Sequence, residues 1–139
     1  MVWVTWQNVR VDRMACAWLI RRFIDPEAEF VFLPEGETGV PEAAAGFDIP
    51  GSQYSHRRGR ASFHALLSDH GLEDEVLHLI ARIVDEADVV QEEALEAVAP
   101  GLDLICRGVS MTSPSDAVSL ARGALIYDGL YAALSGGKS

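Results

Sequence analysis

The stretch VDRMACAWLIRRFIDPEAEFVF, residues 11–32, decides the fold of this chain. Asp12 has the side chain of a helix N-cap, and a helical run follows it as far as Asp25-Pro26, where proline stops the helix. At about 100° per residue, one face of this helix carries Asp12, Ala15, Cys16, Leu19 and Phe23. Residues 28–33 then alternate in polarity and contain two phenylalanines, which is typical of a strand. The stretch predicts a helix that turns a carboxylate and a thiol toward the core.

Length and composition indicate one soluble globular domain over residues 1–139. Hydrophobic residues make up 49% of the chain and charged residues 23%, which is typical of a packed protein and not of a disordered one. We expect no membrane segment, because no apolar run approaches the roughly 20 residues of a span. The N-terminus lacks the pattern of a signal peptide, and two cysteines are too few for a disulfide framework. We therefore expect a cytoplasmic protein.

The net charge of −10 is spread unevenly. Residues 1–60 hold seven arginines against eight acids, whereas residues 61–139 hold four basic residues against thirteen acids. Binding to nucleic acid requires clustered cations, so we expect no nucleic-acid binding by this chain on its own. Ten of the eleven cations are arginines, whose planar fork suits oxyanions and buried ion pairs alike. The N-terminal half can thus host an anion locally, or its arginines simply pair with the surplus acids.

The remaining pattern predicts an α+β fold, with a small N-terminal β-sheet, packed helices and a mainly helical C-terminal half. Residues 2–6 form a β-branched and aromatic run, typical of a strand. A loop rich in Gly, Pro and Glu is expected over 34–46, and Pro50-Gly51 marks a turn. Helices are expected over 63–70 (with Ser62 as N-cap), 73–90, 92–98, 102–108 (after a break at Pro100-Gly101) and 113–134.

The last of these helices is apolar around most of its circumference, so we expect it to be buried, centrally or in a subunit interface. Asp128 lies on the same stripe as Ala121, Ala124 and Tyr131. A buried carboxylate needs a partner, and the candidates are Arg13, Arg22 or a metal ion. Asp12 and Asp128 are thus the two expected buried polar residues.

Further motifs extend across the chain: FDIPG at 47–51, SH at 55–56, SF at 62–63, IVDEAD at 83–88 and LIYDGLYA at 125–132. Together with residues 11–32, they resemble the C-terminal domain of the ChrB chromate-resistance proteins, the regulatory partners of a bacterial chromate transporter. The resemblance implies a role in chromate or general oxyanion stress. In relatives with two domains, a separate N-terminal region is expected to recognise DNA. We therefore expect no transcriptional control by this chain alone, unless a separate partner supplies it.

The candidate anion-binding residues are Arg13, Arg22 and Cys16. We expect a pocket between the first helix and residues 47–60, with Arg13 orienting the site and His56 contributing an imidazole. A thiol beside arginines and near a helix N-terminus favours the thiolate, which could sense or reduce chromate. The alternative is that Cys16 packs in the core as a small hydrophobic residue.

The candidate metal ligands are His56, Asp85 and Asp48. The four histidines show no HxxxH or HExxH spacing, so this site depends on the resemblance. The resemblance implies a polar cluster with an acid near position 53, a cysteine near position 61 and a histidine near position 85. This chain has Gln53, Ala61 and Asp85 at those positions. An imidazole with carboxylates suits zinc, iron(II) or manganese. Alternatively, His56 holds a loop through hydrogen bonds.

Three functions remain open from the sequence. The first is a sensor or accessory protein whose partner is a small oxyanion or a metal ion. The second is a metal-dependent enzyme using His56 and nearby carboxylates. The third is an interaction module that forms a homodimer through its apolar final helix. Neither GxSxG nor a glycine-rich phosphate loop occurs, so the sequence names no catalytic residue.

Overall fold

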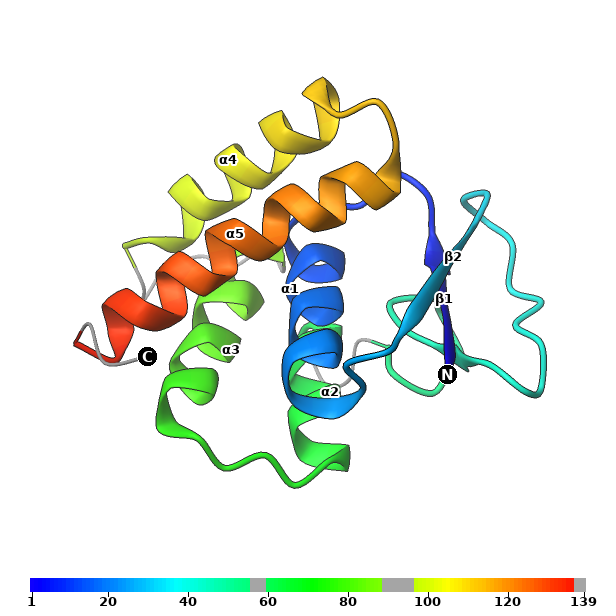
Figure 1. Ribbon diagram of the computed structural model, residues 1–139, viewed down its shortest axis with the longest axis horizontal. Coiled ribbons are helices and arrows are strands. Elements are labelled where there is room, and N and C mark those ends of the chain that lie inside the picture. Colours follow the sequence, from blue (N-terminus) through cyan, green and yellow to red (C-terminus); the bar gives the residue numbers. More distant parts are fainter. Residues whose placement is uncertain (56–59, 89–96, 137–139) are drawn as a thin grey trace.

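A computed structural model describes residues 1–55, 60–88 and 97–136 of the chain, and Figure 1 shows their arrangement. A small sheet lies at one side of the molecule and the helices pack beside it. The elements are β1 (Val2–Trp6), α1 (Val11–Leu19), η1 (Ile20–Ile24), β2 (Glu29–Leu33), β3 (Ala45–Gly46), α2 (Ser62–Asp69), α3 (Glu75–Asp88), α4 (Ala99–Thr112) and α5 (Asp116–Leu134). The α+β class predicted from the sequence is confirmed.

The strands form a parallel sheet in the order β2-β1-β3. Parallel neighbours require a crossover, and α1 with η1 supplies it between β1 and β2. The register runs from Val2 opposite Glu29 to Trp6 opposite Leu33. β3 lies where the sequence predicted a loop, and that expectation is wrong. Two residues that include a glycine carry no strand pattern, and β3 forms only because β1 offers its second edge.

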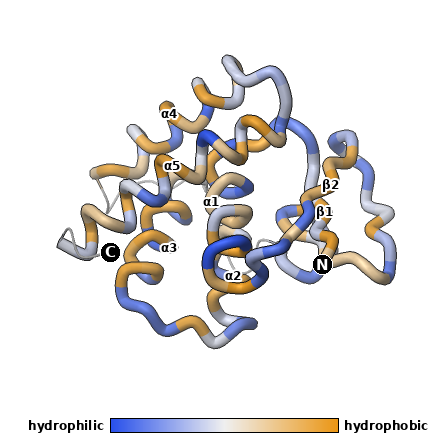
Figure 2. The backbone as a smooth tube through the Cα atoms, in the orientation of Figure 1, coloured by the Kyte–Doolittle hydropathy of each residue, from blue (hydrophilic) through white to orange (hydrophobic). Residues whose placement is uncertain are grey.

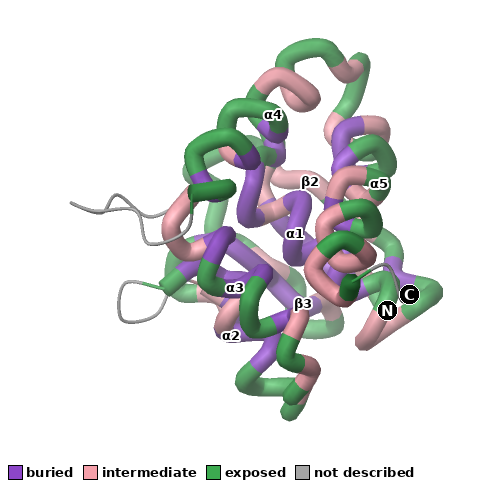
Figure 3. The backbone as a smooth tube through the Cα atoms, turned by 90° about the vertical axis from the view of Figure 1, so that its left-hand side faces the viewer, coloured by how far each residue is buried: buried purple, intermediate pink, exposed green. Residues whose placement is uncertain are grey.

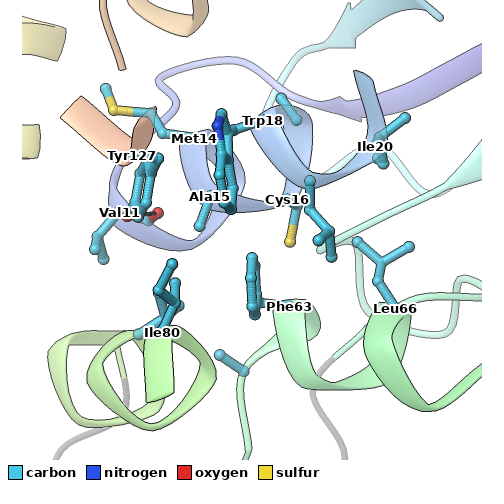
Figure 4. Packing of buried hydrophobic residues seen from close by; sticks show 14 of the residues in the cluster. Val11, Met14, Ala15, Cys16, Trp18, Ile20, Phe63, Leu66, Ile80 and Tyr127 are labelled. Carbon is cyan, nitrogen blue, oxygen red and sulfur yellow. Dashed lines mark hydrogen bonds between the residues drawn. The ribbon is translucent and has the colours of Figure 1, made fainter. Parts of the chain in front are cut away.

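The central helix is α1. Eight of its nine residues are buried, and it contacts α2, α3, α4 and α5. Figure 3 shows this concentration of buried backbone along α1. Small side chains at Ala15, Cys16 and Ala17 let several helices approach at once. Figure 4 shows Cys16 on α1 facing Phe63 and Leu66 on α2.

The prediction that the final helix is buried centrally is wrong, and its burial in a subunit interface stays a prediction. α5 buries Ser119, Leu120, Gly123 and Tyr127, whereas the side chain of Leu125 is 73% exposed. Alanines make α5 apolar in every direction, but they bury little surface and do not indicate which face is covered. α1 takes the central place instead. Within the described ranges, none of the helices combines the length and apolarity that crossing a membrane requires.

Several helix ends differ from the expected ones. Pro100 lies in the first turn of α4, so Pro100-Gly101 begins a helix there and does not break one. α5 begins at Asp116, where the Oγ of Ser115 accepts from the N–H of Val118 at 3.2 Å. α3 begins two residues later than expected, at Glu75, and its expected end at residue 90 lies outside the described residues. The helix expected over 92–98 falls largely outside the described residues.

Candidate functional site

Asp12 joins α1 to the N-terminus of α2. Its Oδ2 accepts from the N–H of Ser62 at 2.9 Å, and its Oδ1 accepts from the N–H of Phe63 at 3.1 Å. The expectation that Asp12 caps its own helix is therefore wrong, because α1 starts one residue before it. The carboxylate is buried, as predicted, and caps a different helix. Its charge also meets the positive end of the α2 dipole.

Two more carboxylates reach the same helix end. Asp85, on α3, accepts from the N–H of Ala61 at 2.8 Å, and Asp48 accepts from the hydroxyl of Ser62 at 3.1 Å. Asp48 has a φ of +52°, which is uncommon for a residue with a side chain. Three segments far apart in the sequence thus meet at the N-terminus of α2. This convergence serves the fold, because it satisfies backbone N–H groups that a helix leaves unpaired.

Arg13 lies beside this cluster and is already paired. Its Nη2 donates to the backbone oxygen of Asp48 at 2.9 Å, and its Nε lies 3.3 Å from Oδ2 of Asp48. A pocket of about 360 Å³ adjoins the pair, lined by Trp6, Arg13, Asp48, Pro50, Gly51 and Ser55. Among the residues that the structure describes, one cation and one anion line it. Residues 56–59, which follow Ser55, lie outside the described part of the chain.

Cys16 lies in the core and away from that pocket. Its side chain is fully buried, and its Sγ donates to Oδ1 of Asp12 at 3.3 Å. A thiolate in this position would face a carboxylate, which opposes the predicted activation by arginines. The second cysteine, Cys106, is buried against Tyr127, and burial raises the pKa of its thiol to about 11. The geometry favours the packing role for both thiols.

The predicted metal ligands have a mixed outcome. His56 lies outside the described residues. Across residues 1–55, 60–88 and 97–136, no group of three or more His, Cys, Asp or Glu side chains could hold a metal ion. Asp48 and Asp85 each accept a hydrogen bond at the end of α2 through Oδ1, and carboxylates that ligate a metal are commonly hydrogen-bonded in this way as well. The metal site stays a prediction.

A second pocket, of about 540 Å³, lies between α1-η1, β2 and α5. Apolar side chains form most of its wall, and two adjacent arginines and one carboxylate supply its charges. Its lining residues are Ala17, Trp18, Arg21, Arg22, Phe30, Leu120, Ala124 and Asp128. The arginines come from η1, a stretch of π-helix at the end of α1, and π-helical turns are frequent at functional sites.

The two arginines of this pocket differ in their partners. Arg21 donates from Nε and Nη2 to the backbone oxygen of Ala28, at 3.4 and 3.2 Å, and stacks on Phe30 with 4.6 Å between the guanidinium carbon and the ring centroid. Among the residues that the structure describes, it pairs with no carboxylate. Arg22 instead forms an ion pair with Asp128 at 3.1 Å.

Asp128 is exposed, and the expectation that it is buried is wrong. Its side chain is 54% exposed, and its Oδ1 accepts from Nη1 of Arg22 and from Nε1 of Trp18 at 2.8 Å. Arg22 was one of its two candidate arginine partners and is the one observed. The carboxylate lies at the rim of the pocket because α5 turns this face outward.

Comparison with known proteins shows the family of the chain. The family model of the ChrB C-terminal domain matches residues 3–134. The chain belongs to this family. It is also 39% identical over 130 residues to protein ChrB of Cupriavidus metallidurans, which covers 93% of this chain and 39% of that protein's length. No solved structure matches the chain.

The sequence analysis expected, from the resemblance alone, a polar cluster with a cysteine near position 61 and a histidine near position 85. In this chain those positions hold Ala61 and Asp85, whose N–H and carboxylate are in contact. Gln53, the third position, is exposed and donates from Nε2 to the hydroxyl of Tyr54 at 3.2 Å. This member of the family has neither the thiol nor the imidazole there.

The candidate anion-binding residues do not share a site. Arg13 lines the smaller pocket, Cys16 lies in the core and Arg22 lines the larger pocket. The sequence analysis did not select Arg21, although the double arginine was visible. What the pattern could not indicate is that β2 would place Phe30 beneath the Arg21 guanidinium.

Proposed function

We propose that this chain acts in chromate resistance as a cytoplasmic accessory protein that binds an oxyanion, and that the anion binds at Arg21 and Arg22. The observation that carries the proposal is the state of Arg21. This guanidinium lines a pocket of about 540 Å³, and the described residues offer it no carboxylate. A guanidinium presents several N–H groups in a plane, which matches the oxygens of a tetrahedral anion.

The charge of the pocket supports the same ligand. Among the described lining residues, Arg21 and Arg22 bring two positive charges and Asp128 brings one negative charge, so this part of the wall is net positive in a protein of net charge −10. Both arginines also lie in the last turn of the first helix, where cations are stabilised by the dipole. The helix dipole explains why cations occur at this helix end, but it does not explain why a pocket lies beside them.

Both guanidinium groups are held in place before any ligand arrives. Arg21 is fixed by the oxygen of Ala28 and the ring of Phe30. Arg22 lies over the ring of Tyr131, with 4.4 Å between the guanidinium carbon and the ring centroid. Ordering long side chains costs free energy on binding, and these contacts lower that cost. The pocket exceeds the volume of one tetrahedral anion, so water fills the remainder.

Isothermal titration of the purified protein with chromate, and with sulfate as a dianion of the same shape without its redox chemistry, tests the proposal. We expect Arg21→Gln to weaken binding at least about tenfold, because it removes one charge-assisted contact. Arg10→Gln is the matched control, since Arg10 is exposed at the opposite end of α1. Unchanged binding by Arg21→Gln, or its loss in Arg13→Gln instead, would contradict the proposal.

Asp128→Asn should change the affinity for the anion in the opposite direction. The carboxylate competes with an incoming anion for Arg22, so its neutralisation should tighten binding about threefold, the scale of an exposed ion pair. A variant that binds more weakly than wild type would show that Asp128 helps to hold the ligand, and would contradict the anion assignment.

A further inference from the structure

The pocket beside Arg21 and Arg22 has a charged rim and an apolar floor. Both arginines and Asp128 belong to the exposed residues of the chain. The apolar lining consists of Ala17, Trp18, Phe30, Leu120 and Ala124. Three of these side chains are buried, namely Ala17, Trp18 and Leu120. Figure 2 shows the same division at the end of α1, where hydrophilic residues follow hydrophobic ones. An inorganic anion at the rim contacts only the charged part of this lining.

The pocket has more room than an inorganic oxyanion requires. Its volume of about 540 Å³ lies within the roughly 300–1,000 Å³ that is typical of pockets for organic ligands. A smaller cavity of about 80 Å³ shares Arg21, Phe30 and Leu120 with it and adds Phe32 and Ala117 to the lining. Water beside an apolar wall finds few hydrogen-bond partners, so an apolar group that displaces this water gains affinity. The space beyond the rim therefore favours a ligand with an apolar body.

Arg21 keeps one edge of its guanidinium for the head of such a ligand. Its Nε and Nη2 donate to the backbone oxygen of Ala28, at 3.4 and 3.2 Å, and this contact occupies one edge of the planar group. The edge formed by Nη1 and Nη2 carries further N–H groups. Among the residues that the structure describes, Nη1 of Arg21 donates to no acceptor. Two parallel N–H groups match the two oxygens of a carboxylate.

The charge of the rim matches a single negative charge. Arg22 is paired with Asp128 at 3.1 Å, whereas Arg21 has no carboxylate among the described residues. Two arginines and one aspartate give the described lining a net charge of +1. A carboxylate head, which is ionised at neutral pH, neutralises this charge.

We propose that this pocket takes an organic monocarboxylate with an apolar body. The carboxylate head binds Arg21, and the body lies on the apolar floor between α1, β2 and α5. This inference rests on the anion site of the proposed function and names the class of organic ligand that the site accepts. Chromate and sulfate then occupy the place of the head and leave the floor to water.

Isothermal titration of the wild type with acetate, butyrate, hexanoate and octanoate tests this proposal. The four probes share one head group, so a gain in affinity along the series comes from the apolar body. We expect the affinity to rise about two- to fourfold for each added methylene, the upper value being that of complete burial. Sulfate should displace octanoate competitively, because both bind Arg21.

The outcomes separate this inference from the proposed function. Equal affinities along the series, with sulfate still bound through Arg21, overturn the inference and leave the anion site intact. Octanoate that binds without displacing sulfate lies elsewhere on the protein, which also overturns it. Absence of binding by sulfate and by all four carboxylates overturns both.

Ala124→Leu tests the floor separately from the rim. Ala124 is half-buried on α5 and lines the pocket, so leucine fills space that the apolar body needs. We expect octanoate binding to fall about tenfold, the equivalent of two buried methylenes, while sulfate binding stays within about twofold of wild type. Retained sulfate binding also shows that the variant is folded. Should leucine prevent folding, Ala124→Val makes the same comparison with a smaller side chain.

Ala121→Leu is the matched control, because Ala121 is exposed on the same helix and lies outside the lining of the pocket. It should bind octanoate and sulfate as wild type does. If folded Ala124→Leu weakens both ligands equally, or weakens neither, the body does not lie on this floor and the inference is wrong.

Discussion

A single carboxylate, that of Asp12, joins two helices that are 50 residues apart along the chain. It accepts from two backbone N–H groups at the start of α2 and from the thiol of Cys16. A buried charge is tolerated only where such donors surround it. At the scale of the residue, the hydrogen bonds of Asp12 make it part of the fold, and the proposed anion site lies at the arginines of the other pocket.

Asp12→Asn should lower the free energy of unfolding by about 2–3 kcal/mol. The amide has one acceptor oxygen where the carboxylate has two, and its NH₂ group would face a backbone N–H that needs an acceptor. Urea unfolding measures the change. Glu42→Gln, in the exposed loop before β3, is the control and should leave the free energy of unfolding within about 0.5 kcal/mol of wild type. An equally small effect at Asp12 would contradict its capping role.

The pair of Asp74 and Tyr131 adds a pH dependence. The hydroxyl of Tyr131 donates to Oδ2 of Asp74 at 2.5 Å, and this bond holds the pKa of the carboxyl below its ordinary value of 3.8. A depressed pKa stabilises the folded state above pH 3.8, and that contribution is lost as the pH falls through the lower folded value.

The free energies of unfolding of wild type and Tyr131→Phe should therefore differ at pH 6, with wild type the more stable, and converge below about pH 3.8. Urea titrations at several pH values give both curves. Curves that stay parallel down to pH 3 would show that the tyrosine stabilises the fold by packing alone.

At the scale of the element, the sequence predicts the helices and strands whose residues show a strong periodic pattern. β1, α1 and β2 were all expected from alternation and from the helical stripe of residues 11–25. β3 has two residues and no pattern, and only the tertiary structure creates it. For the candidate site, Arg22 was selected from sequence and Arg21 was not, because the contacts that distinguish them come from β2 and α5, which no local pattern encodes.

The packing of α5 on α1 depends on a close approach at Gly123. A Cβ atom there would lie 3.1 Å from Cβ, Cγ and Sδ of Met14. We expect Gly123→Ala to destabilise the fold by about 1 kcal/mol, since overpacking outweighs the better helix propensity of alanine. On the same helix, Gly129→Ala meets nothing within 4 Å and should stabilise by about 0.5–1 kcal/mol. Thermal unfolding of both variants measures the contrast, and shifts of the same sign would contradict the close approach.

At the scale of the whole molecule, an anion-binding site must work inside an acidic protein. The net charge of −10 repels anions at a distance, but salt screens such repulsion over about 8 Å at physiological ionic strength. Contacts within the pocket act at shorter range, and there Arg21 and Arg22 outnumber Asp128. Among the described lining residues, Asp128 is the one acid from residues 61–139, and it offsets one of the two arginine charges.

Anomalous diffraction from crystals soaked in molybdate, a tetrahedral oxyanion with a heavy central atom, tests the anion site most directly. The account predicts one strong peak between the guanidinium groups of Arg21 and Arg22, and its loss in crystals of Arg21→Gln. A peak beside Arg13 and Trp6 with none at Arg21, or no peak at any arginine under conditions where titration detects binding, would contradict it.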